Sequence, residues 1–466
     1  MSFPRFIISG LAGGTGKTFV SLGAIRAFAN RGLAVRAFKK GPDYIDTAWL
    51  ARAARNPASN LDPFMLPPEG LLTLFSKGPK NADLSVIEGN RGFFDGRDLQ
   101  GSCSTAELAK TLDAPVVLVV DCTKVTRTVA ALVSGCRHFP EGERIAGVIL
   151  NRAARSRHGS LARRAVEELA GLPVFGVLPR LPAAPIFERR EGLVTVQEHR
   201  DAEAALDTLA GMLEENADLN TLLDLGMNAS PLPEFRQASL FPEDVIQGKP
   251  RIGVVRDAAL WQYYDENLEA LRRAGAEIIP LSLLRRTPSG TPCATPCPWP
   301  ELDGLYLGGG DLSPCAETLA ADHERRAEVA ALIDAGLPVY AEQAGLFYLL
   351  ESYRAGDRVF PMAGLFPFYA RREKTPQGLG YVEADASSSC PYFFGQTQIR
   401  GHEFRFETLN GVAEKGLFTR NPMVGLAPTE DGFLHKQCFG SLMQIFAPAV
   451  PGWAERFVRA AAENAR

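Results

Sequence analysis

The chain has 466 residues, of which 46% are hydrophobic and 22% charged, a composition ordinary for a soluble globular protein of two or three domains. Its formal net charge of −4 gives no electrostatic reason to expect a nucleic acid or an anionic membrane as a partner. No run of about 18 apolar residues occurs, and the N-terminus opens on an apolar strand instead of a signal core. We therefore expect a cytoplasmic protein.

Short runs rich in β-branched residues alternate with helical stretches over residues 1–227. Strands are expected at residues 5–9, 33–38, 84–88, 116–120, 145–150 and 174–178. Strands separated by helices are typical of a parallel, doubly wound sheet. The sequence therefore predicts an α/β domain over residues 1–227.

A second series of this kind follows residues 228–250, a stretch rich in proline and polar residues that is expected to link two domains. Its strands are expected at residues 251–255, 277–280, 304–307 and 338–340, and a Thr-, Pro- and Cys-rich insertion lies near 287–300. The sequence therefore predicts a second doubly wound α/β domain over residues 251–466.

A glycine-rich string, Gly-Leu-Ala-Gly-Gly-Thr-Gly-Lys-Thr at residues 10–18, joins the first expected strand to a helix. In that context backbone N–H groups and the helix N-terminus bind phosphate, so the string predicts an ATP site. The expected nucleotide contacts are Gly13, Gly14, Thr15, Gly16, Lys17 and Thr18. Lys17 would neutralise phosphate charge and Thr18 would ligate Mg²⁺. Leu11 stands where the standard spacing has glycine, and the alternative is a turn that merely joins a strand to a helix.

Two acidic segments follow the second and third expected strands. The first contains Asp43 and Asp46, and the second contains Glu88 and Asp95. Ligands of open α/β sheets bind at the carboxyl ends of the strands, and phosphoryl transfer needs carboxylates to hold Mg²⁺. Asp43 and Glu88 are the expected metal ligands with Thr18, and all four carboxylates are expected at the catalytic site. Taken singly, each is more often a turn residue or a helix cap, and only the phosphate loop beside them favours the catalytic role.

Several strings together resemble the cobyrinate a,c-diamide synthase family. They are Phe-Lys-Lys-Gly-Pro-Asp-Tyr-Ile-Asp at residues 38–46, Ile-Glu-Gly at 87–89, Gly-Leu-Tyr-Leu-Gly-Gly-Gly at 304–310 and Arg-Gly-His-Glu-Phe at 400–404. The resemblance extends over nearly the whole chain in the same order.

The resemblance implies an ATP domain like that of dethiobiotin synthetase, followed by a domain like the class I glutamine amidotransferases. Members of the family activate a peripheral carboxylate of a tetrapyrrole with the γ-phosphate of ATP, and ammonia then converts it to an amide. By resemblance, Asp43, Asp46 and Glu88 serve Mg²⁺ and carboxylate activation, Asp95 assists them, and Asn151 contacts the adenine. A homodimer is expected by the same analogy.

The chain departs from the family at the glutaminase nucleophile. The family reads Glu-Cys-Gly-Gly at a strand–turn–helix elbow, where this chain has Glu-Gln-Ala-Gly at residues 342–345. An amide cannot form a thioester, so Gln343 predicts an inactive glutaminase. Near the C-terminus the family has His-x-His, where this chain has His-Lys-Gln, beginning at His435. We therefore expect ammonia, free or from a partner, as the nitrogen donor. Cys315 and Cys438 are the alternative nucleophiles, and neither lies on an elbow.

Other strings bear on the substrate. Tyr44, Arg400, His402 and Glu403 match the family and are expected to contact the substrate, with the second domain as a cradle and lid; the alternative is a solvated turn. Residues 90–94, 121–128 and 188–193 differ from corrin-acting members and look more like variants linked to sirohaem amidation. The expected substrate is thus a corrin, sirohaem or sirohydrochlorin.

Two alternatives to an amide synthetase remain open. A nucleotide switch of the partition-ATPase kind would have a second lysine early in the loop, where this chain has Ala12, and would leave the carboxylate strings without a role. A non-catalytic protein that binds a tetrapyrrole would fit the loss of the glutaminase. Equilibrium ATP binding without turnover would favour it.

Overall fold

The structure is a computed structural model and describes residues 3–77, 82–154, 156–181, 183–186, 188–189, 192–196, 199, 201–285, 299–413, 415–422, 424 and 430–465. The chain divides into two compact units, residues 1–238 and 239–466, and each is described by itself. Within the described ranges no helix is both long and apolar enough to cross a bilayer. Most of the insertion near residues 287–300, and residues 190–191, lie outside the described part of the chain.

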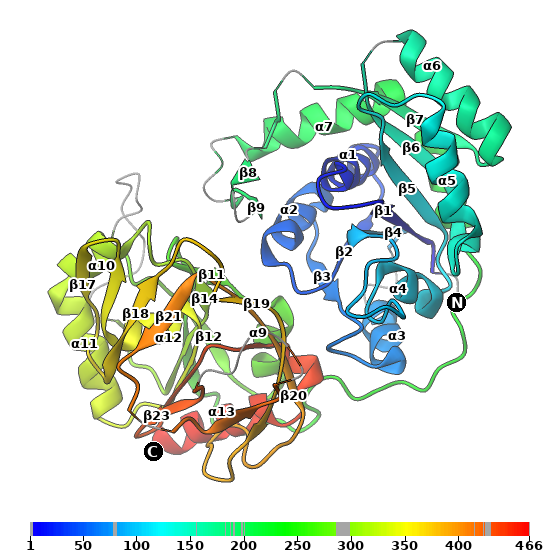
Figure 1. Cartoon of the computed structure of the whole chain (residues 1–466). Coiled ribbons are helices and arrows are strands. Elements are labelled where there is room, and N and C mark those ends of the chain that lie inside the picture. The colour runs from blue at the N-terminus through cyan, green and yellow to red at the C-terminus, as the bar shows by residue number, and fades with distance from the viewer. Residues whose placement is uncertain are drawn as a thin grey trace. The chain divides into compact units, whose positions relative to one another are not determined.

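Unit 1 is built on a sheet of seven strands in the order β3-β2-β4-β1-β5-β6-β7, and every neighbouring pair is parallel (Figure 1). The strands are β1 (Arg5–Gly10), β2 (Val35–Lys40), β3 (Ala58–Leu61), β4 (Leu84–Gly92), β5 (Val116–Asp121), β6 (Ile145–Ala153) and β7 (Val174–Pro179). A separate hairpin joins β8 (Glu188–Arg189) to β9 (Gly192–Leu193).

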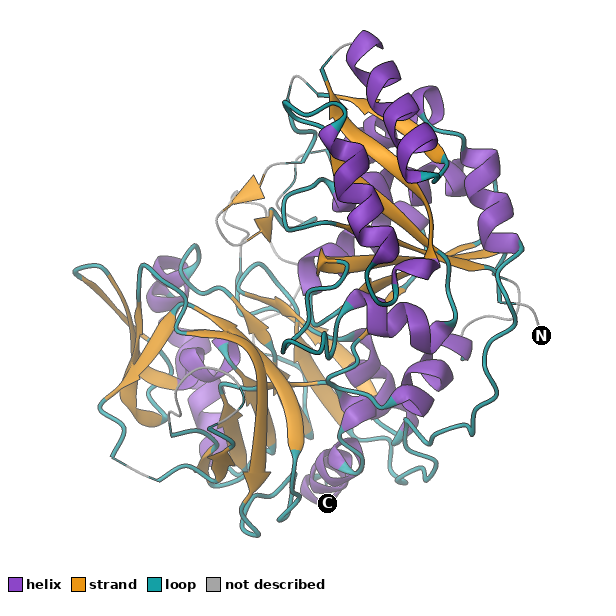
Figure 2. Cartoon of the chain, turned by 45° about the vertical axis from the view of Figure 1, so that its right-hand side comes forward, coloured by secondary structure: helices purple, strands orange, loops and turns teal. Residues whose placement is uncertain are grey.

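Helices cover both faces of this sheet (Figure 2). They are α1 (Lys17–Asn30), α2 (Tyr44–Ala54), α3 (Pro68–Ser76), α4 (Thr105–Leu112), α5 (Thr128–His138), α6 (Ser156–Ala165), α7 (Ala202–Asn216) and α8 (Leu219–Met227), with short turns η1 (Gly142–Arg144) and η2 (Val166–Ala170). The alternation of strands and helices confirms the doubly wound α/β fold. The sequence missed only β3 among the sheet strands of this unit, because Ala-Ser-Asn-Leu has no β-branched residue.

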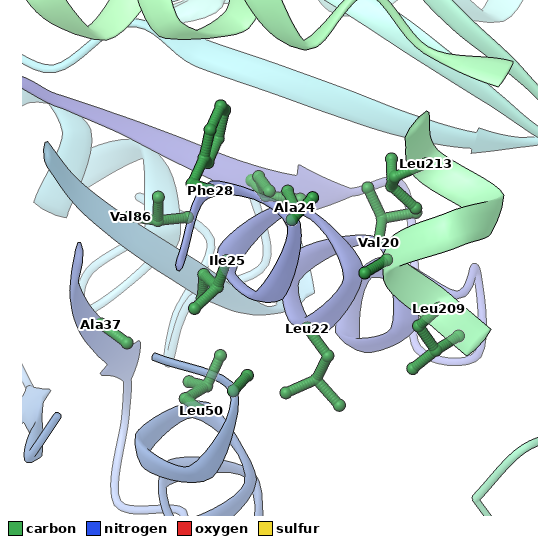
Figure 3. Close-up of a cluster of buried hydrophobic side chains, with 14 of the residues drawn as sticks. Val20, Leu22, Ala24, Ile25, Phe28, Ala37, Leu50, Val86, Leu209 and Leu213 are labelled. Carbon is green, nitrogen blue, oxygen red and sulfur yellow. The ribbon is translucent and has the colours of Figure 1, made fainter. Parts of the chain in front are cut away.

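Helix α1 lies at the centre of the core of unit 1. Val20, Ile25 and Phe28 on this helix are fully buried, and they point among side chains of α2, α7, β2 and β4 (Figure 3). A Cβ added to Gly23 would lie 2.7 Å from the carbonyl oxygen of Leu209, so only glycine permits the close approach of α1 and α7. This packing fixes the helix whose first turn follows the glycine-rich loop.

Unit 2 has a central sheet in the order β12-β10-β13-β15-β24-β23, in which only β23 is antiparallel to its neighbour. Its strands are β10 (Arg251–Val255), β12 (Glu277–Leu281), β13 (Gly304–Leu307), β15 (Val339–Glu342), β23 (Phe433–His435) and β24 (Cys438–Ser441). The helices are α9 (Asp265–Arg273), α10 (Ala316–Ala321), α11 (His323–Asp334), α12 (Ala344–Leu349) and α13 (Trp453–Asn464), with the short turn η3 (Ala447–Ala449).

Three smaller sheets complete unit 2, and the sequence did not predict them. Their orders are β11-β14, β17-β16-β18-β21 and β22-β19-β20-β25. The strands are β11 (Leu260–Gln262), β14 (Gly309–Gly310), β16 (Leu350–Ala355), β17 (Arg358–Pro361), β18 (Phe366–Arg372), β19 (Gly378–Ala386), β20 (Ile399–Arg405), β21 (Glu407–Asn410), β22 (Phe418–Arg420) and β25 (Gln444–Ile445). The expectation of an α/β unit is confirmed for the central sheet, while the smaller sheets depend on pairings between distant segments that no local pattern reveals.

Candidate active site and the degenerate elbow

The glycine-rich loop connects β1 to α1 and is braced from β6. Gly16 caps α1 in the left-handed region, with φ 88°, and a Cβ there would lie 2.2 Å from Nδ2 of Asn151. The same Nδ2 donates a 2.9 Å hydrogen bond to the carbonyl oxygen of Thr15. The loop therefore needs glycine at position 16, and Asn151 holds it in place.

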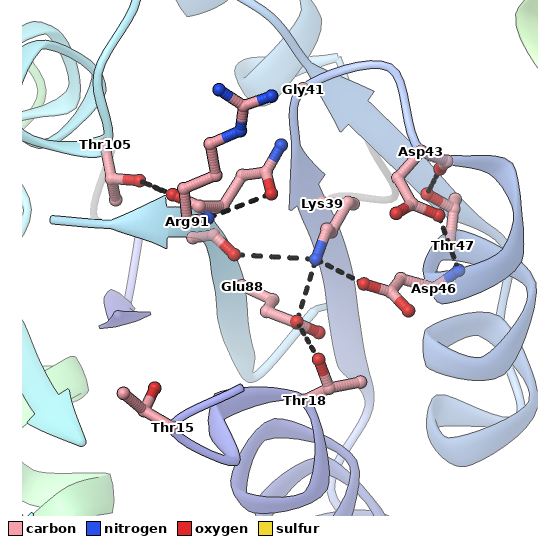
Figure 4. Close-up of polar contacts among 12 residues, drawn as sticks. Thr15, Thr18, Lys39, Gly41, Asp43, Asp46, Thr47, Glu88, Arg91 and Thr105 are labelled. Carbon is pink, nitrogen blue, oxygen red and sulfur yellow. Dashed lines mark hydrogen bonds and ion pairs between the residues drawn. The ribbon is translucent and has the colours of Figure 1, made fainter. Parts of the chain in front are cut away.

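Thr18, in the first turn of α1, contacts the acidic end of β4. Its hydroxyl donates a 2.6 Å hydrogen bond to Oε1 of Glu88, and Lys39 Nζ lies 2.8 Å from the same oxygen. Lys39 also donates to Oδ2 of Asp46 at 2.5 Å (Figure 4). Three of the expected site residues are thus connected through a lysine that the sequence analysis did not single out.

Lys39 is the residue that sequence reasoning missed. It is 1% exposed and lies at the end of β2, beside β4, where the register pairs it with Glu88. Burial by itself would lower the pKa of Lys39, but the carboxylates of Asp46, Glu88 and Asp43 outweigh it and raise the pKa well above its usual range. The signal was present in the Lys-Lys-Gly-Pro-Asp string, since a lysine at the end of a buried strand faces either the core or a ligand.

Burial opposes the ionisation of two of the carboxylates, Glu88 and Asp43. Burial raises the pKa of Glu88, although Lys39 opposes the shift. Burial, and then the charge of Asp46, raises the pKa of Asp43 to about 7. Burial, and then the charge of Lys39, lowers the pKa of Lys17. A cluster of this kind is typical of sites that handle phosphate and a divalent cation.

Asp43 has a structural role that the sequence left open. It caps α2, and its Oδ1 accepts a 2.9 Å hydrogen bond from the backbone N–H of Asp46. Tyr44, the first residue of α2, is half-buried. The cap directs the first turn of α2, with Asp46, toward Lys39.

The oxygen atoms around Thr18 fit a magnesium ion. Oε2 of Glu88 is buried and has no hydrogen-bond partner among the described residues. Mg²⁺ prefers oxygen ligands, and it is commonly held by one or two carboxylates together with substrate phosphates. Among the described residues, no three acidic, His or Cys side chains form a cluster that could hold a metal alone. Phosphate oxygens would therefore have to complete the coordination.

Asp95 lies beyond the end of β4 and is exposed. Its Oδ2 accepts a 2.9 Å hydrogen bond from the backbone N–H of Gly92. A Cβ on Gly92 would lie 2.6 Å from both this carboxylate oxygen and the carbonyl oxygen of Leu11 in the glycine-rich loop. Asp95 is thus beside the loop, although no hydrogen bond from it to Glu88 or Lys39 occurs among the described residues.

A cavity of about 180 Å³ lies beside the glycine-rich loop. Its lining includes Gly16, Phe19, Asn151, Pro179 and Leu181. The cavity is apolar along α1 and polar at β6, as a site for a flat heteroaromatic base requires. The side chain of Asn151 faces this cavity while its amide remains bonded to the loop.

In unit 2, Gln343 occupies the elbow between β15 and α12. Its φ of 44° and ψ of −103° lie outside the ordinary regions for a non-glycine residue. The side chain is 2% exposed; Oε1 accepts a 2.9 Å bond from the N–H of Gly310, and Nε2 donates a 2.8 Å bond to the carbonyl of Phe404. The carboxamide therefore fills the space above the elbow.

His435 does not lie beside Gln343. It pairs with Cys438 in the β23–β24 hairpin, and Cys438 pairs with Val339 at the start of β15, whereas Gln343 follows the end of β15. These positions are separated by the length of β15, about 10 Å. The Nε2 of His435 lies 2.9 Å from Oδ1 of Asp334 instead.

Two other glutamines are next to the elbow. A Cβ on Gly309 would lie within 2.9 Å of side-chain amide atoms of Gln343, Gln444 and Gln262. Gln444 Nε2 donates to Oε1 of Gln262 at 3.2 Å. Only the fold reveals this group, because its members come from the elbow before α12, from β25 and from β11.

The thiols considered as substitute nucleophiles are not on the elbow. Cys438 begins β24, at the end remote from Gln343, and burial raises the pKa of its thiol. Cys315 lies before α10 and is 1% exposed. A buried thiol with a raised pKa is a poor nucleophile.

Two of the expected substrate contacts in unit 2, His402 and Glu403, are internal, whereas the Arg400 side chain is 40% exposed. Glu403 is 3% exposed and forms ion pairs with Arg420 and Arg405, and His402 is also buried. Arg400 forms an ion pair with Glu383 at 3.3 Å. The ion pairs of Glu403 stabilise β20 and its neighbours. A substrate cradle that includes Arg400, His402 and Glu403 stays a prediction.

Residues 6–193 match the family described as CobQ/CobB/MinD/ParA nucleotide binding domain, and residues 251–447 match the family described as CobB/CobQ-like glutamine amidotransferase domain. The chain is similar to proteins named cobyrinate a,c-diamide synthase. It is 38% identical to the one from Magnetococcus marinus, over 98% of this chain and 97% of that protein. Identity is 34% to one from Dehalococcoides mccartyi, over 98% of each. The chain is 36% identical to the cobyrinate a,c-diamide synthase of Caldanaerobacter subterraneus, over 94% of each protein.

This chain belongs to the cobyrinate a,c-diamide synthase family. The family assignment confirms the resemblance read from the sequence strings. It also confirms the class of enzyme, an ATP-dependent ligase that forms amides. Within a family defined by a glutamine amidotransferase domain, the carboxamide at position 343 is a departure that the function has to accommodate.

Proposed function

We propose that this protein amidates peripheral carboxylates of a tetrapyrrole, with Mg-ATP as the activating reagent and ammonia as the nitrogen donor. The single observation that carries the proposal is the hydrogen bond from Thr18, which follows the glycine-rich loop, to Oε1 of Glu88, an oxygen that also accepts from Lys39. This arrangement joins a phosphate site to a group of carboxylates at one end of the sheet. The family assignment supports the same chemistry.

In the proposed reaction an oxygen of the substrate carboxylate attacks the γ-phosphorus of ATP, the bond to the bridging oxygen breaks, and ADP leaves. The nitrogen of ammonia then attacks the acyl carbon, the bond to the phosphate oxygen breaks, phosphate leaves and nitrogen loses a proton. Phosphorylation is needed because a carboxylate is unreactive toward ammonia at neutral pH.

The chain's own residues have defined parts in this scheme. Thr18 and Glu88 would hold Mg²⁺, which screens the phosphate charge when it is bound. Lys17 would neutralise phosphate oxygens, and Lys39 would keep Glu88 and Asp46 oriented. Asp43 would position α2, and it can accept a proton near neutral pH because its pKa is about 7.

Asp95 and Asn151 border the site from either side. Asp95 would assist at the acyl group beside the loop. Asn151 would hold the loop and face the nucleotide base in the small cavity.

The glutaminase half is proposed to be inactive. The carboxamide of Gln343 would have to leave Gly310 and Phe404 before a glutamine could reach the elbow, and it has no nucleophilic atom to offer. The side chain next to it is Gln444, which cannot act as a base. Ammonia would therefore come from solution or from a partner protein.

The substrate is proposed to be sirohaem, sirohydrochlorin or a corrin acid. The test is incubation of the protein with Mg-ATP, ammonium and either sirohaem or cobyrinate, followed by mass spectrometry. We expect products lighter by about one mass unit per amide, and ADP release that needs both tetrapyrrole and ammonium. ATP binding without ADP release, with both tetrapyrroles present, would instead support a non-catalytic binding protein. Equal turnover with glutamine would contradict the inactive glutaminase.

A further inference from the structure

A groove of about 680 Å³ lies on unit 1 beyond the end of β4, between β4, α4 and the segment after α5. Its lining includes Arg91, Phe94, Asp95, Leu99, Lys110 and Phe139. The groove combines exposed aromatic and aliphatic side chains with two cations. Apart from Asp95, these side chains have no role in the phosphate chemistry described above.

The groove adjoins the glycine-rich loop. The backbone N–H of Phe93 donates a 2.7 Å hydrogen bond to the carbonyl of Gly10. Asp95, which lines the groove, approaches Gly92, and Gly92 packs on the carbonyl of Leu11. A ligand in the groove can therefore reach the phosphate site with one edge.

Arg91 is held at the end of β4 in a strained conformation. Its φ is 50°, and the side-chain Oδ1 of Asn90 accepts a 2.9 Å hydrogen bond from its backbone N–H. The side chain is exposed, and its guanidinium extends away from the Glu88–Lys39 contacts (Figure 4). No ion pair to this guanidinium occurs among the residues that the structure describes. A strained backbone at a residue whose charged side chain forms no ion pair is typical of ligand sites.

The acidic side chains of the groove are mostly occupied by the backbone. Oδ1 of Asp98 accepts bonds from the N–H groups of Gln100 and Ser102, at 3.1 and 3.0 Å. Glu107 accepts from the N–H of Cys103, and Asp95 from that of Gly92. Glu141 is the remaining carboxylate of the lining, which also contains Lys110. The charge of Arg91 is thus left for a ligand.

The apolar side of the groove is unusually exposed. The rings of Phe94 and Phe139 lie 4.8 Å apart at 61°, and Phe139 is 55% exposed. Leu99 is 98% exposed. An edge-to-face aromatic pair beside a free guanidinium fits a flat conjugated molecule that has carboxylates on its rim.

We propose that Arg91 is a specificity-determining residue that binds a rim carboxylate of the tetrapyrrole in this groove, while Phe94 and Phe139 contact its face. The proposal rests on the proposed function and adds where the macrocycle binds. An arginine can form two parallel hydrogen bonds to a carboxylate, and a lysine cannot. The anchored carboxylate would set which neighbouring carboxylate reaches the phosphate loop.

The experiment compares the wild-type protein with Arg91→Met, Arg91→Lys and the control Arg97→Met. Arg97 lies on the same loop but faces the ring of Phe64 and does not line the groove. Binding of sirohaem and of cobyrinate is measured by absorbance titration without ATP, and KM values are measured for each substrate. Arg91→Met should raise the tetrapyrrole Kd and KM about 10- to 100-fold, the loss expected for a hydrogen bond between charged groups.

In the same variant the KM values for ATP and ammonium should stay unchanged. The tetrapyrrole Kd and KM of Arg91→Lys should lie between those of the wild type and Arg91→Met. Those of Arg97→Met should match the wild type. If Arg91→Met binds the tetrapyrrole as the wild type does, or if its KM for ATP rises instead, the assignment of Arg91 is wrong while the proposed function stands. If the wild-type protein binds neither tetrapyrrole and releases no ADP, the proposed function fails and this inference fails with it.

Discussion

The hydroxyl of Thr18 and the carboxylate of Glu88 are joined by a 2.6 Å hydrogen bond, although the residues are 70 positions apart in the chain. The bond connects the first turn of α1 to the buried end of β4. It brings two of the three expected metal ligands, from different strings of the sequence, to one point. Glu88 keeps its second oxygen buried and unpartnered among the described residues, so the pair has capacity for one more ligand.

Removing the Thr18 hydroxyl should weaken the use of magnesium. We expect Thr18→Ala to raise the Mg²⁺ concentration needed for half-maximal ADP release by about 10- to 100-fold. Thr18→Ser should retain most of the activity, because it keeps the oxygen. Magnesium titrations at saturating ATP measure this. An unchanged magnesium requirement in Thr18→Ala would show that the hydroxyl is not a ligand.

Replacing Lys39 should destabilise unit 1. The Lys39 ammonium lies 2.5 Å from the carboxylate of Asp46 and 2.8 Å from that of Glu88. Lys39→Met removes the ammonium and leaves both carboxylates without it. Loss of one member of a buried ion pair typically costs about 3–5 kcal/mol of folding free energy. The double variant Lys39→Met, Glu88→Gln should regain part of this, since one buried charge is removed. Hydrogen exchange of α1 and α2 measures the opening free energy, with exposed Lys124→Met as the control. Equal protection in Lys39→Met and wild type would contradict the prediction.

Asp43 should make stability fall as the pH rises. Its pKa is about 7 in the folded protein and about 3.9 in the unfolded chain. Between these values the folded state binds the proton more tightly, so the favourable contribution is present at low pH and is lost as the pH rises toward 7. Asp43→Asn should therefore gain stability relative to wild type between pH 5 and 8, on the order of 1–2 kcal/mol for a partly exposed group.

A matched control is available for Asp43. Asp218 also caps a helix, α8, but its hydrogen bonds to Thr221 lower the pKa of its carboxyl. Asp218→Asn should therefore not gain stability with rising pH. Urea unfolding at pH 5 and pH 8 measures the free energy of unfolding of both variants. The same change with pH in both would rule out a raised pKa of Asp43 as the cause.

Restoring the cysteine alone should not restore the glutaminase. We expect Gln343→Cys to release no glutamate from glutamine, because the side chain beside it is Gln444, whose amide cannot act as a general base. Only the double variant Gln343→Cys, Gln444→His should show release above background. His435→Ala should have no effect on either activity, since His435 pairs with Asp334. Glutamate release by Gln343→Cys alone would mean that another base serves the elbow.

Most of unit 1 could be predicted from the sequence, because strands and helices alternate and their edges carry strong local signals. The pattern failed for β3, which has weak strand propensity, and for the small sheets of unit 2, whose strands pair across long separations. The neighbours of His435 also depend on how β23 pairs with β24. A hairpin turns it toward Asp334, and no spacing in the sequence shows that.

The sequence by itself determined the phosphate loop, the α/β class, the family and the loss of the cysteine, because each is a matter of residue type within a short contiguous string. The tertiary structure decided which charges meet. It placed Lys39 between Glu88 and Asp46, buried Glu403 in ion pairs, brought Gln444 to Gln343 and left Arg91 free of any described ion pair. Those outcomes depend on which strand ends lie side by side and on how much water they exclude, and both follow from packing between residues far apart in the chain.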